Sequence, residues 1–133
     1  MRLAILLAGA VLASCSVTAG QPVKTSAADA AALDDALAGR VAGEPRSCVR
    51  QQDVRNSRSA GGDTILFDGP GGVVYANRTS GSCPRILPWH ALSHRTSGTN
   101  MCAGELIRVF DPQSGVEYGG CSLGAFVPYR RVD

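Results

Sequence analysis

The sequence predicts a small, mainly β domain, built as an antiparallel barrel or curled sheet of five to six short strands with one N-terminal helix and braced by disulfides. Residues 63–78 (DTILFDGPGGVVYANR) place two β-branched or aromatic runs on either side of a Gly- and Pro-rich turn, which is the pattern of a β-hairpin. Further short apolar runs alternate with Gly-rich turns as far as residue 130. Four cysteines fall in the same region, an even number typical of two disulfides in a small exported domain.

Residues 1–14 predict a signal peptide. Arg2 precedes an apolar run at residues 3–12, which is shorter than the roughly 20 residues of a membrane-spanning helix. The sequence LASC at residues 12–15 follows, and it resembles the lipobox of bacterial lipoprotein precursors. That resemblance implies cleavage before Cys15, acylation of Cys15 and a lipid anchor in the membrane. The alternative is an ordinary signal peptide that is cleaved after Ala19 and leaves a soluble periplasmic or secreted protein.

Residues 15–25 form the acylated Cys and a small, polar tether, and a helix is expected over residues 26–43. Ser26 and Asp29 have the spacing of a capping box. An apolar residue then recurs at every fourth position: Leu33, Leu37 and Val41. Because short Ala-rich helices are marginal in isolation, a partly disordered spacer is the alternative.

The β domain is expected over residues 46–130. Strands are expected at residues 47–54, 64–67, 73–77, 105–110, 116–121 and 123–128, with a loop at 56–62 and a turn at 111–115. Pro84 and Pro88 exclude a long helix or a central strand between them, so residues 89–95 form either one helical turn or a short edge strand. The expected core comprises Ile65, Leu66, Phe67, Val73, Val74, Tyr75, Leu106, Ile107, Val109, Phe110, Leu123 and Phe126.

Four cysteines remain after Cys15, and they allow three pairings: Cys48, Cys83, Cys102 and Cys121. We expect Cys83 to pair with Cys102, because these two residues enclose the Pro-rich segment with the weakest secondary structure. The remaining bridge would then join Cys48, at the start of the first strand, to Cys121, at the end of the penultimate strand. Small cores need such covalent support.

Several short runs of this sequence resemble a family of small exported proteobacterial proteins of unknown function. They are AGEPRSCV (42–49), DTILF (63–67), VYANR (74–78), CP (83–84), a Cys before a charged strand (102–108) and CSLGAFVPY (121–129). The resemblance spans most of residues 37–130 and supports the limits of the domain. It implies no activity and no catalytic residues.

The charge of the chain disfavours a nucleic-acid partner. The formal net charge is +2, and residues 46–133 hold ten Arg against seven Asp or Glu, an excess of three. Nucleic-acid-binding domains carry a more concentrated basic surface, and the few aromatic residues here offer little for stacking bases.

The arginines are the better functional candidates. Four of them gather in the first strand and the loop after it: Arg46, Arg50, Arg55 and Arg58. The planar guanidinium group suits phosphate and carboxylate, and in a bacterial envelope these anions belong to lipid headgroups, lipopolysaccharide or peptidoglycan. The alternative is a solvated surface on which each Arg has a nearby Asp or Glu, since surface pairs of this kind are common.

The two histidines, His90 and His94, have the spacing that places both rings on one face of a helix. With Cys83 and Cys102 on either side, the order of residues superficially suggests zinc. However, Pro88 shortens any helix here, and exported thiols tend to oxidise. We therefore expect no metal ion and no other cofactor. The chain also has neither a Gly-x-Ser-x-Gly motif nor a phosphate-binding Gly loop before a helix.

Together these features predict a non-enzymatic lipoprotein of the cell envelope that faces the periplasm and binds or supports another envelope component. The outer membrane is favoured over the inner one because Ser16, rather than Asp, follows the acylated Cys. The alternative is a small periplasmic hydrolase or metal-binding protein that uses His90 and His94.

Overall fold

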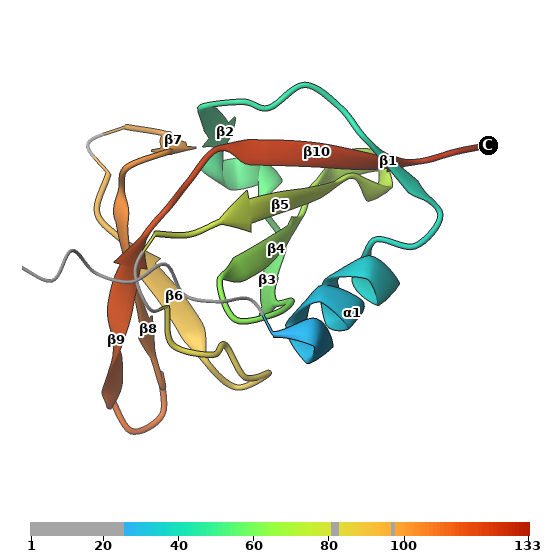
Figure 1. Cartoon of the computed structure of the whole chain (residues 1–133). Helices are drawn as coiled ribbons and strands as arrows, with labels where there is room; N and C mark the ends of the chain where they lie inside the picture. The colour runs from blue at the N-terminus through green and yellow to red at the C-terminus, as the bar shows by residue number, and fades with distance from the viewer. Residues whose placement is uncertain (1–25, 81–82, 97) are drawn as a thin grey trace, which may run out of the picture.

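The computed structural model describes residues 26–80, 83–96 and 98–133, so the signal peptide, Cys15 and the tether lie outside the described residues. The largest element is a five-stranded antiparallel sheet in the order β1-β10-β5-β4-β3 (Figure 1). Its strands are β1 (Arg40–Ala42), β10 (Phe126–Arg131), β5 (Val74–Arg78), β4 (Thr64–Asp68) and β3 (Asn56–Ser59).

The remaining strands form two smaller antiparallel sheets. One has the order β6-β8-β9, and the other pairs β2 with β7. Their strands are β6 (Ala91–His94), β8 (Leu106–Phe110), β9 (Glu117–Ser122), β2 (Cys48–Arg50) and β7 (Asn100–Cys102). The mainly β class with one helix is therefore confirmed. The described strands do not close into a barrel, and they are more numerous than expected.

The hairpin that dominates the sequence forms β4 and β5, with Leu66 opposite Ala76 and Phe67 opposite Tyr75. The connecting residues Pro70–Gly72 make a 3₁₀ turn in which Gly71 and Gly72 have φ values of 66° and 74°. Glycine is favoured at both positions because side chains with a Cβ rarely adopt positive φ. The local turn chemistry thus accounts for this hairpin.

The helix α1 (Ala27–Ala36) begins with the expected capping box, in which Asp29 N donates to Ser26 Oγ and the Asp29 carboxylate accepts from Ser26 N. It ends well before residue 43. Gly39 has a φ of 71°, and the chain then enters β1, where Arg40 pairs with Arg131. Val41 consequently lies on an exposed edge strand instead of continuing the apolar stripe of the helix.

The five-stranded sheet is covered on both faces. On one face, α1 packs its half-buried apolar residues against a small cluster formed by Ala60, Leu66 and Val74. On the other face, a larger cluster joins the sheet to β8, β9 and the β2–β7 pair; its buried residues include Ile65, Phe67, Tyr75, Met101, Ile107, Val109, Leu123 and Phe126. Most of the expected core is buried, but Leu106 is 54% exposed and Phe110 is only half-buried.

Three strands were not expected from the sequence: β1, β3 and β7. The expected loop at residues 56–62 contains β3, while the expected strand at 47–54 is reduced to β2 and the 3₁₀ turn Gln51–Asp53. The segment 89–95 forms the short edge strand β6, one of the two alternatives. No helix among the described residues has the length and apolar character needed to cross a membrane.

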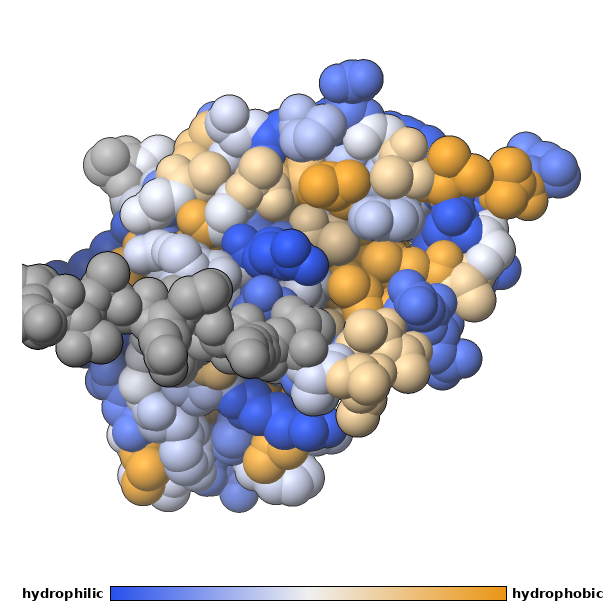
Figure 2. Space-filling model, in the orientation of Figure 1, coloured by the Kyte–Doolittle hydropathy of each residue, from blue (hydrophilic) through white to orange (hydrophobic). Residues whose placement is uncertain are grey.

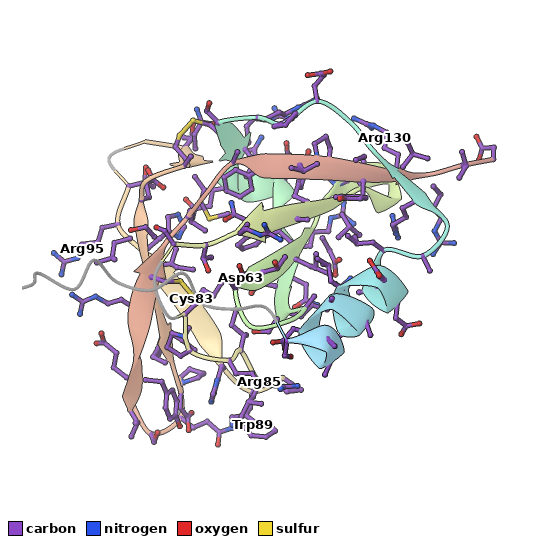
Figure 3. All side chains as sticks on the ribbon, viewed as in Figure 1. Asp63, Cys83, Arg85, Trp89, Arg95 and Arg130 are labelled. Carbon is purple, nitrogen blue, oxygen red and sulfur yellow. A yellow bond between two sulfur atoms is a disulfide. The ribbon has the colours of Figure 1, made fainter. Side chains whose placement is uncertain are left out.

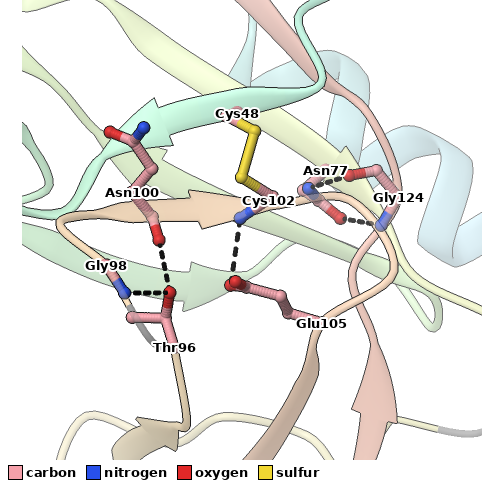
Figure 4. The surroundings of a disulfide bond; sticks show 8 residues. All are labelled: Cys48, Asn77, Thr96, Gly98, Asn100, Cys102, Glu105 and Gly124. Atoms are coloured by element: carbon pink, nitrogen blue, oxygen red, sulfur yellow. Dashed lines mark hydrogen bonds between the residues drawn. A yellow bond between two sulfur atoms is a disulfide. The ribbon is translucent and has the colours of Figure 1, made fainter.

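Two disulfides form, as expected, but the expected pairing is wrong: the bridges are Cys48–Cys102 and Cys83–Cys121. Cys48 and Cys102 lie directly opposite each other in the β2–β7 pair, which the sequence analysis missed because it did not recognise β7 (Figure 4). Cys83 is bridged to Cys121 of β9, and Ser80 forms an isolated bridge with the neighbouring Ser122.

Candidate ligand-binding cavity

The strongest candidate site is a cavity of about 320 Å³ between the five-stranded sheet and the three-stranded sheet. It is lined by residues of β3 and β6, which are edge strands of two different sheets and do not pair with each other. The cavity therefore lies between two sheet edges that do not pair with each other.

The floor of the cavity is apolar and belongs to the protein core. Phe67 of β4, Met101 of β7 and Ile107 of β8 are 1%, 4% and 1% exposed. Val54 and Leu92 complete this apolar surface and are half-buried. Each of these residues comes from a different strand or connection, so only the folded chain brings them together.

The remaining lining residues are polar: Gln51, Arg55, Asn56, Ser57 and His94. No Asp or Glu is among the lining residues in the described part of the chain. Ser57 pairs with Phe67 across β3 and β4, so the two side chains lie on the same face of the sheet. The cavity thus combines a buried apolar floor with polar and cationic groups.

His94 is the polar residue with the clearest unmet bonding capacity. It lies opposite Ile107, and Leu92 lies opposite Val109, so the alternation of β6 places both side chains on the core face of the sheet. The Nε2 atom of His94 is buried and has no hydrogen-bond partner among the described residues. Leaving a buried polar atom unpaired costs roughly 1–3 kcal/mol. The atom has almost no accessible surface, so the cavity as it stands does not expose it to a ligand.

Of the four candidate arginines, Arg55 alone lines this cavity. Its side chain is exposed and makes no ion pair with any described residue. Its backbone N donates to Asp68 O at 2.9 Å, which holds the chain at the start of β3. With no carboxylate lining the cavity, the positive charge of Arg55 is uncompensated there.

The other three arginines have different surroundings. Arg50 Nε lies 2.8 Å from Asp53 Oδ2, and Arg58 Nη1 lies 2.6 Å from Asp68 Oδ1. Both therefore match the alternative interpretation, in which each Arg is paired with a nearby carboxylate on the surface. Arg46 is exposed and forms a backbone bridge with Phe126. Figure 3 shows Arg85, Arg95 and Arg130 projecting from different sides of the molecule, so the cationic residues are dispersed.

The histidines do not share a site. His90 precedes β6, accepts a hydrogen bond from Leu87 N at Nδ1 (3.2 Å), and stacks on Tyr118 with ring centroids 4.4 Å apart. Four residues of extended chain span roughly 13 Å, whereas four residues of helix would bring the two rings together. The helical spacing that suggested a joint role for His90 and His94 therefore does not apply.

The metal-site hypothesis has no geometric support in the described residues. No three His, Cys, Asp or Glu side chains there form a group that could hold a metal ion. Cys83 and Cys102, which the zinc interpretation used, are both in disulfides.

Other surface features are less well suited to hold a ligand. A second cavity of about 410 Å³ is bordered by His94, Arg95 and Leu106, and also by Arg108 and Glu117, which form an ion pair at 2.8 Å. Apolar surface on the face in Figure 2 lies chiefly over β10 and beside α1, with a smaller area at the tip of the β8–β9 hairpin. Trp89 is 60% exposed and projects into solvent (Figure 3).

Sequence reasoning identified Arg55 and His94 separately but did not place them together. It missed Ser57 and Met101 because it expected neither β3 nor β7, and it placed Gln51 within a longer strand instead of a 3₁₀ turn. The alternation of Asn and Arg with two serines in residues 56–59 is a weak strand signal that was available in the sequence.

Comparisons of the chain with protein-family models, curated proteins and solved structures gave no match. The function proposed below is therefore argued from the residues of this chain.

Proposed function

We propose that this protein is a non-enzymatic binding module of the bacterial cell envelope, and that its cavity at Arg55 and His94 receives an anionic group of an envelope component. The observation that carries the proposal is the uncompensated charge of Arg55 above an apolar floor. Hydrogen bonds between an Arg and a carboxylate or phosphate are stronger than neutral ones, especially where water is partly excluded.

A lipid anchor at Cys15 is the second part of the proposal. The apolar run and the LASC sequence support it, and the two disulfides suit an oxidising compartment such as the periplasm. Ten residues separate Cys15 from Ser26, where α1 is capped, and they would tether the domain to the outer membrane.

Binding to purified envelope materials tests the first part. Immobilised protein is incubated separately with vesicles of anionic phospholipid, lipopolysaccharide and soluble peptidoglycan fragments. We expect Arg55→Gln to reduce binding of the recognised material by about tenfold or more, since a hydrogen bond to a charged group contributes roughly 1.5–3 kcal/mol. Arg46→Gln is the matched control, because it removes the same charge from an exposed position outside the cavity. Equal losses in both variants would reject a specific role for the cavity.

Fractionation of cells tests the anchor. Cys15→Ala should move the protein from the membrane pellet to the soluble fraction, because stable membrane binding requires more than one acyl chain or an equivalent second signal. If the variant still pellets with membranes after a high-salt wash, the anchor is not at Cys15.

A further inference from the structure

The free edge of β3 carries unpaired backbone groups. In an antiparallel pair, residues whose N–H and C=O groups point toward the partner strand alternate with residues whose groups point away from it. Ala60 N donates to Thr64 O at 2.9 Å, so the alternation along β3 turns the backbone groups of Ser57 away from β4. Among the described residues, no other backbone segment supplies a hydrogen-bond partner for these two groups.

The free edge of β6 has the same property. Leu123 N donates to Glu105 O at 2.9 Å, so the alternation along β8 turns the backbone groups of Ile107 toward β9. His94 lies opposite Ile107 in the β6–β8 pair. The backbone groups of His94, and those of Leu92 two residues before it, therefore point away from β8. No other backbone segment in the described part of the chain pairs with them.

The two free edges border the same cavity. Ser57 of β3 and Leu92 and His94 of β6 all line it, and all three are half-buried. Ile86 N donates to Ser59 Oγ at 2.8 Å, which holds the segment before β6 beside the last residue of β3. Because an unpaired strand edge is a template for main-chain pairing with another chain, these edges suit an added strand.

The floor and the charge of the cavity also suit a strand. Successive side chains of a strand point to opposite faces, so every second side chain of an added strand would face the apolar floor at Phe67, Met101 and Ile107. Arg55 lines the same cavity, and no carboxylate among the described lining residues compensates its charge. Charge complementarity therefore favours a strand with an acidic side chain over a basic one.

We propose that the cavity receives an extended, acidic segment of a partner protein, which pairs through its main chain with the free edge of β6 and with Ser57 of β3. The inference rests on the proposed binding function and names the partner class of that site. It uses the backbone of His94 and not the buried Nε2 atom. Residues 16–25 of this chain include Lys24 and no Asp or Glu, so charge disfavours the tether of the chain itself as the occupant.

The first test uses a library of random hexapeptides, each displayed between two flexible linkers so that it has no free terminus. We expect the oxidised protein to enrich peptides in which apolar and polar residues alternate and at least one residue is Asp or Glu. A selected peptide is then synthesised with an acetylated N-terminus and an amidated C-terminus. In hydrogen-exchange NMR, this peptide should protect the amides of Ser57, Leu92 and His94, which lack main-chain partners in the free protein.

Variants separate main-chain pairing from side-chain contacts. Ser57→Pro and Leu92→Pro each remove one outward N–H, and proline is tolerated on edge strands. Each should bind the peptide about tenfold more weakly than its control, Ser57→Ala or Leu92→Ala, which keeps the N–H and loses the side chain. Unchanged amide spectra in β4 and β5 would show that a variant remains folded.

Changes in the peptide test the same contacts with wild-type protein. N-methylation of alternate peptide nitrogens removes the donors on one edge of the added strand, and methylation of the intervening nitrogens removes those on the other edge. Each set should weaken binding by about tenfold, because the strand pairs on both sides. Replacement of the acidic residue by Lys should weaken binding by a similar factor, and Arg55→Gln should remove that preference.

The inference is wrong if no peptide is enriched, if the Pro variants bind as tightly as the Ala variants, or if the protected amides lie outside the cavity. A loss on one edge only would reject the position between β3 and β6, and self-association through these edges would identify a second copy as the occupant. In each case the proposed function still stands if Arg55→Gln, and not Arg46→Gln, reduces binding of an envelope material. If Arg55→Gln affects no envelope material, the proposed function itself fails.

Discussion

The five-stranded sheet and the three-stranded sheet differ in how many of their faces bury apolar side chains. In β4, residues 64–67 are all buried, because α1 covers one face of the strand and the other sheets cover the opposite face. In β8, buried Ile107 and Val109 alternate with exposed Leu106 and Arg108, so this strand buries one face only. The larger sheet therefore gains apolar burial from both sides, and the smaller sheet gains it from one.

The disulfides follow the same division. Cys48–Cys102 joins β2 to β7, and Cys83–Cys121 joins the segment after β5 to β9. Neither bridge includes a residue of the five-stranded sheet. Both covalent bonds therefore lie outside the five-stranded sheet, in the part of the molecule where β8 buries one face only.

Reduction of both disulfides should have the largest effect on stability, and it should destabilise the smaller sheets more than the five-stranded sheet. The bridges close sequence separations of 54 and 38 residues, and the chain-entropy model assigns about 4 kcal/mol to each. We expect hydrogen exchange in reduced protein to accelerate most at the amides of β2, β8 and β9, and least in β4 and β5. Equal acceleration everywhere would show that the fold unfolds as one cooperative unit and would remove the distinction.

Truncation of one leucine in each sheet gives a matched comparison. Leu66→Ala should lower the free energy of unfolding by about 3 kcal/mol, because Leu66 is fully buried against α1 and its removal leaves a cavity. Leu106→Ala should change it by less than about 0.5 kcal/mol, since Leu106 is 54% exposed. Urea denaturation measures both. Similar losses in the free energy of unfolding would mean that Leu106 is buried in solution by a contact that a single chain does not make.

The connection between the two regions depends on Asn77. Its side chain is fully buried, donates to Gly124 O at 2.8 Å and accepts from Gly124 N at 2.8 Å (Figure 4). Asn77→Ala leaves both backbone groups of Gly124 without this partner, and we expect a loss of about 2 kcal/mol in thermal or urea denaturation. Asn56→Ala is the control, because Asn56 is exposed and its contact with Asp68 is 3.5 Å long. If the two variants are equally stable, the Asn77 link contributes nothing.

The smallest effect concerns the exposed turn of the three-stranded sheet. The hydrogen bond that Asp111 Oδ1 accepts from Gln113 N at 2.8 Å, followed by hydrogen bonds from Ser114, lowers the pKa of Asp111 below its ordinary value. Because the folded pKa is depressed, the stabilisation is present above the unfolded pKa of about 3.9 and is lost as the pH falls through the folded pKa.

A pH titration of the Asp111 carboxyl carbon by NMR measures this shift directly. In parallel, wild type should exceed Asp111→Asn in stability slightly at pH 6 and lose that advantage as the pH falls below about 4. A titration midpoint at or above the ordinary pKa of Asp would contradict the turn geometry.

Local features of this fold were predictable from the sequence. The β4–β5 hairpin, the capping box of α1 and the turn at residues 111–115 are each specified by neighbouring residues, since Gly, Pro, Ser and Asp impose their backbone preferences within a few positions. The involvement of the four later cysteines in disulfides was likewise predictable, because their even number and the predicted signal peptide are read without knowledge of the fold.

Tertiary structure alone decided which segments became partners. The strands β1 and β7 have three residues each and β3 has four, too few to produce a clear periodic pattern, and they exist because β10, β2 and β4 supply their hydrogen bonds. The pairing of Cys48 with Cys102 depends on the β2–β7 register, and the presence of Arg55 and His94 in the lining of one cavity depends on two sheet edges that do not pair with each other. Contacts of this kind join residues tens of positions apart, and their cost in chain entropy is repaid only by the packing of the whole domain.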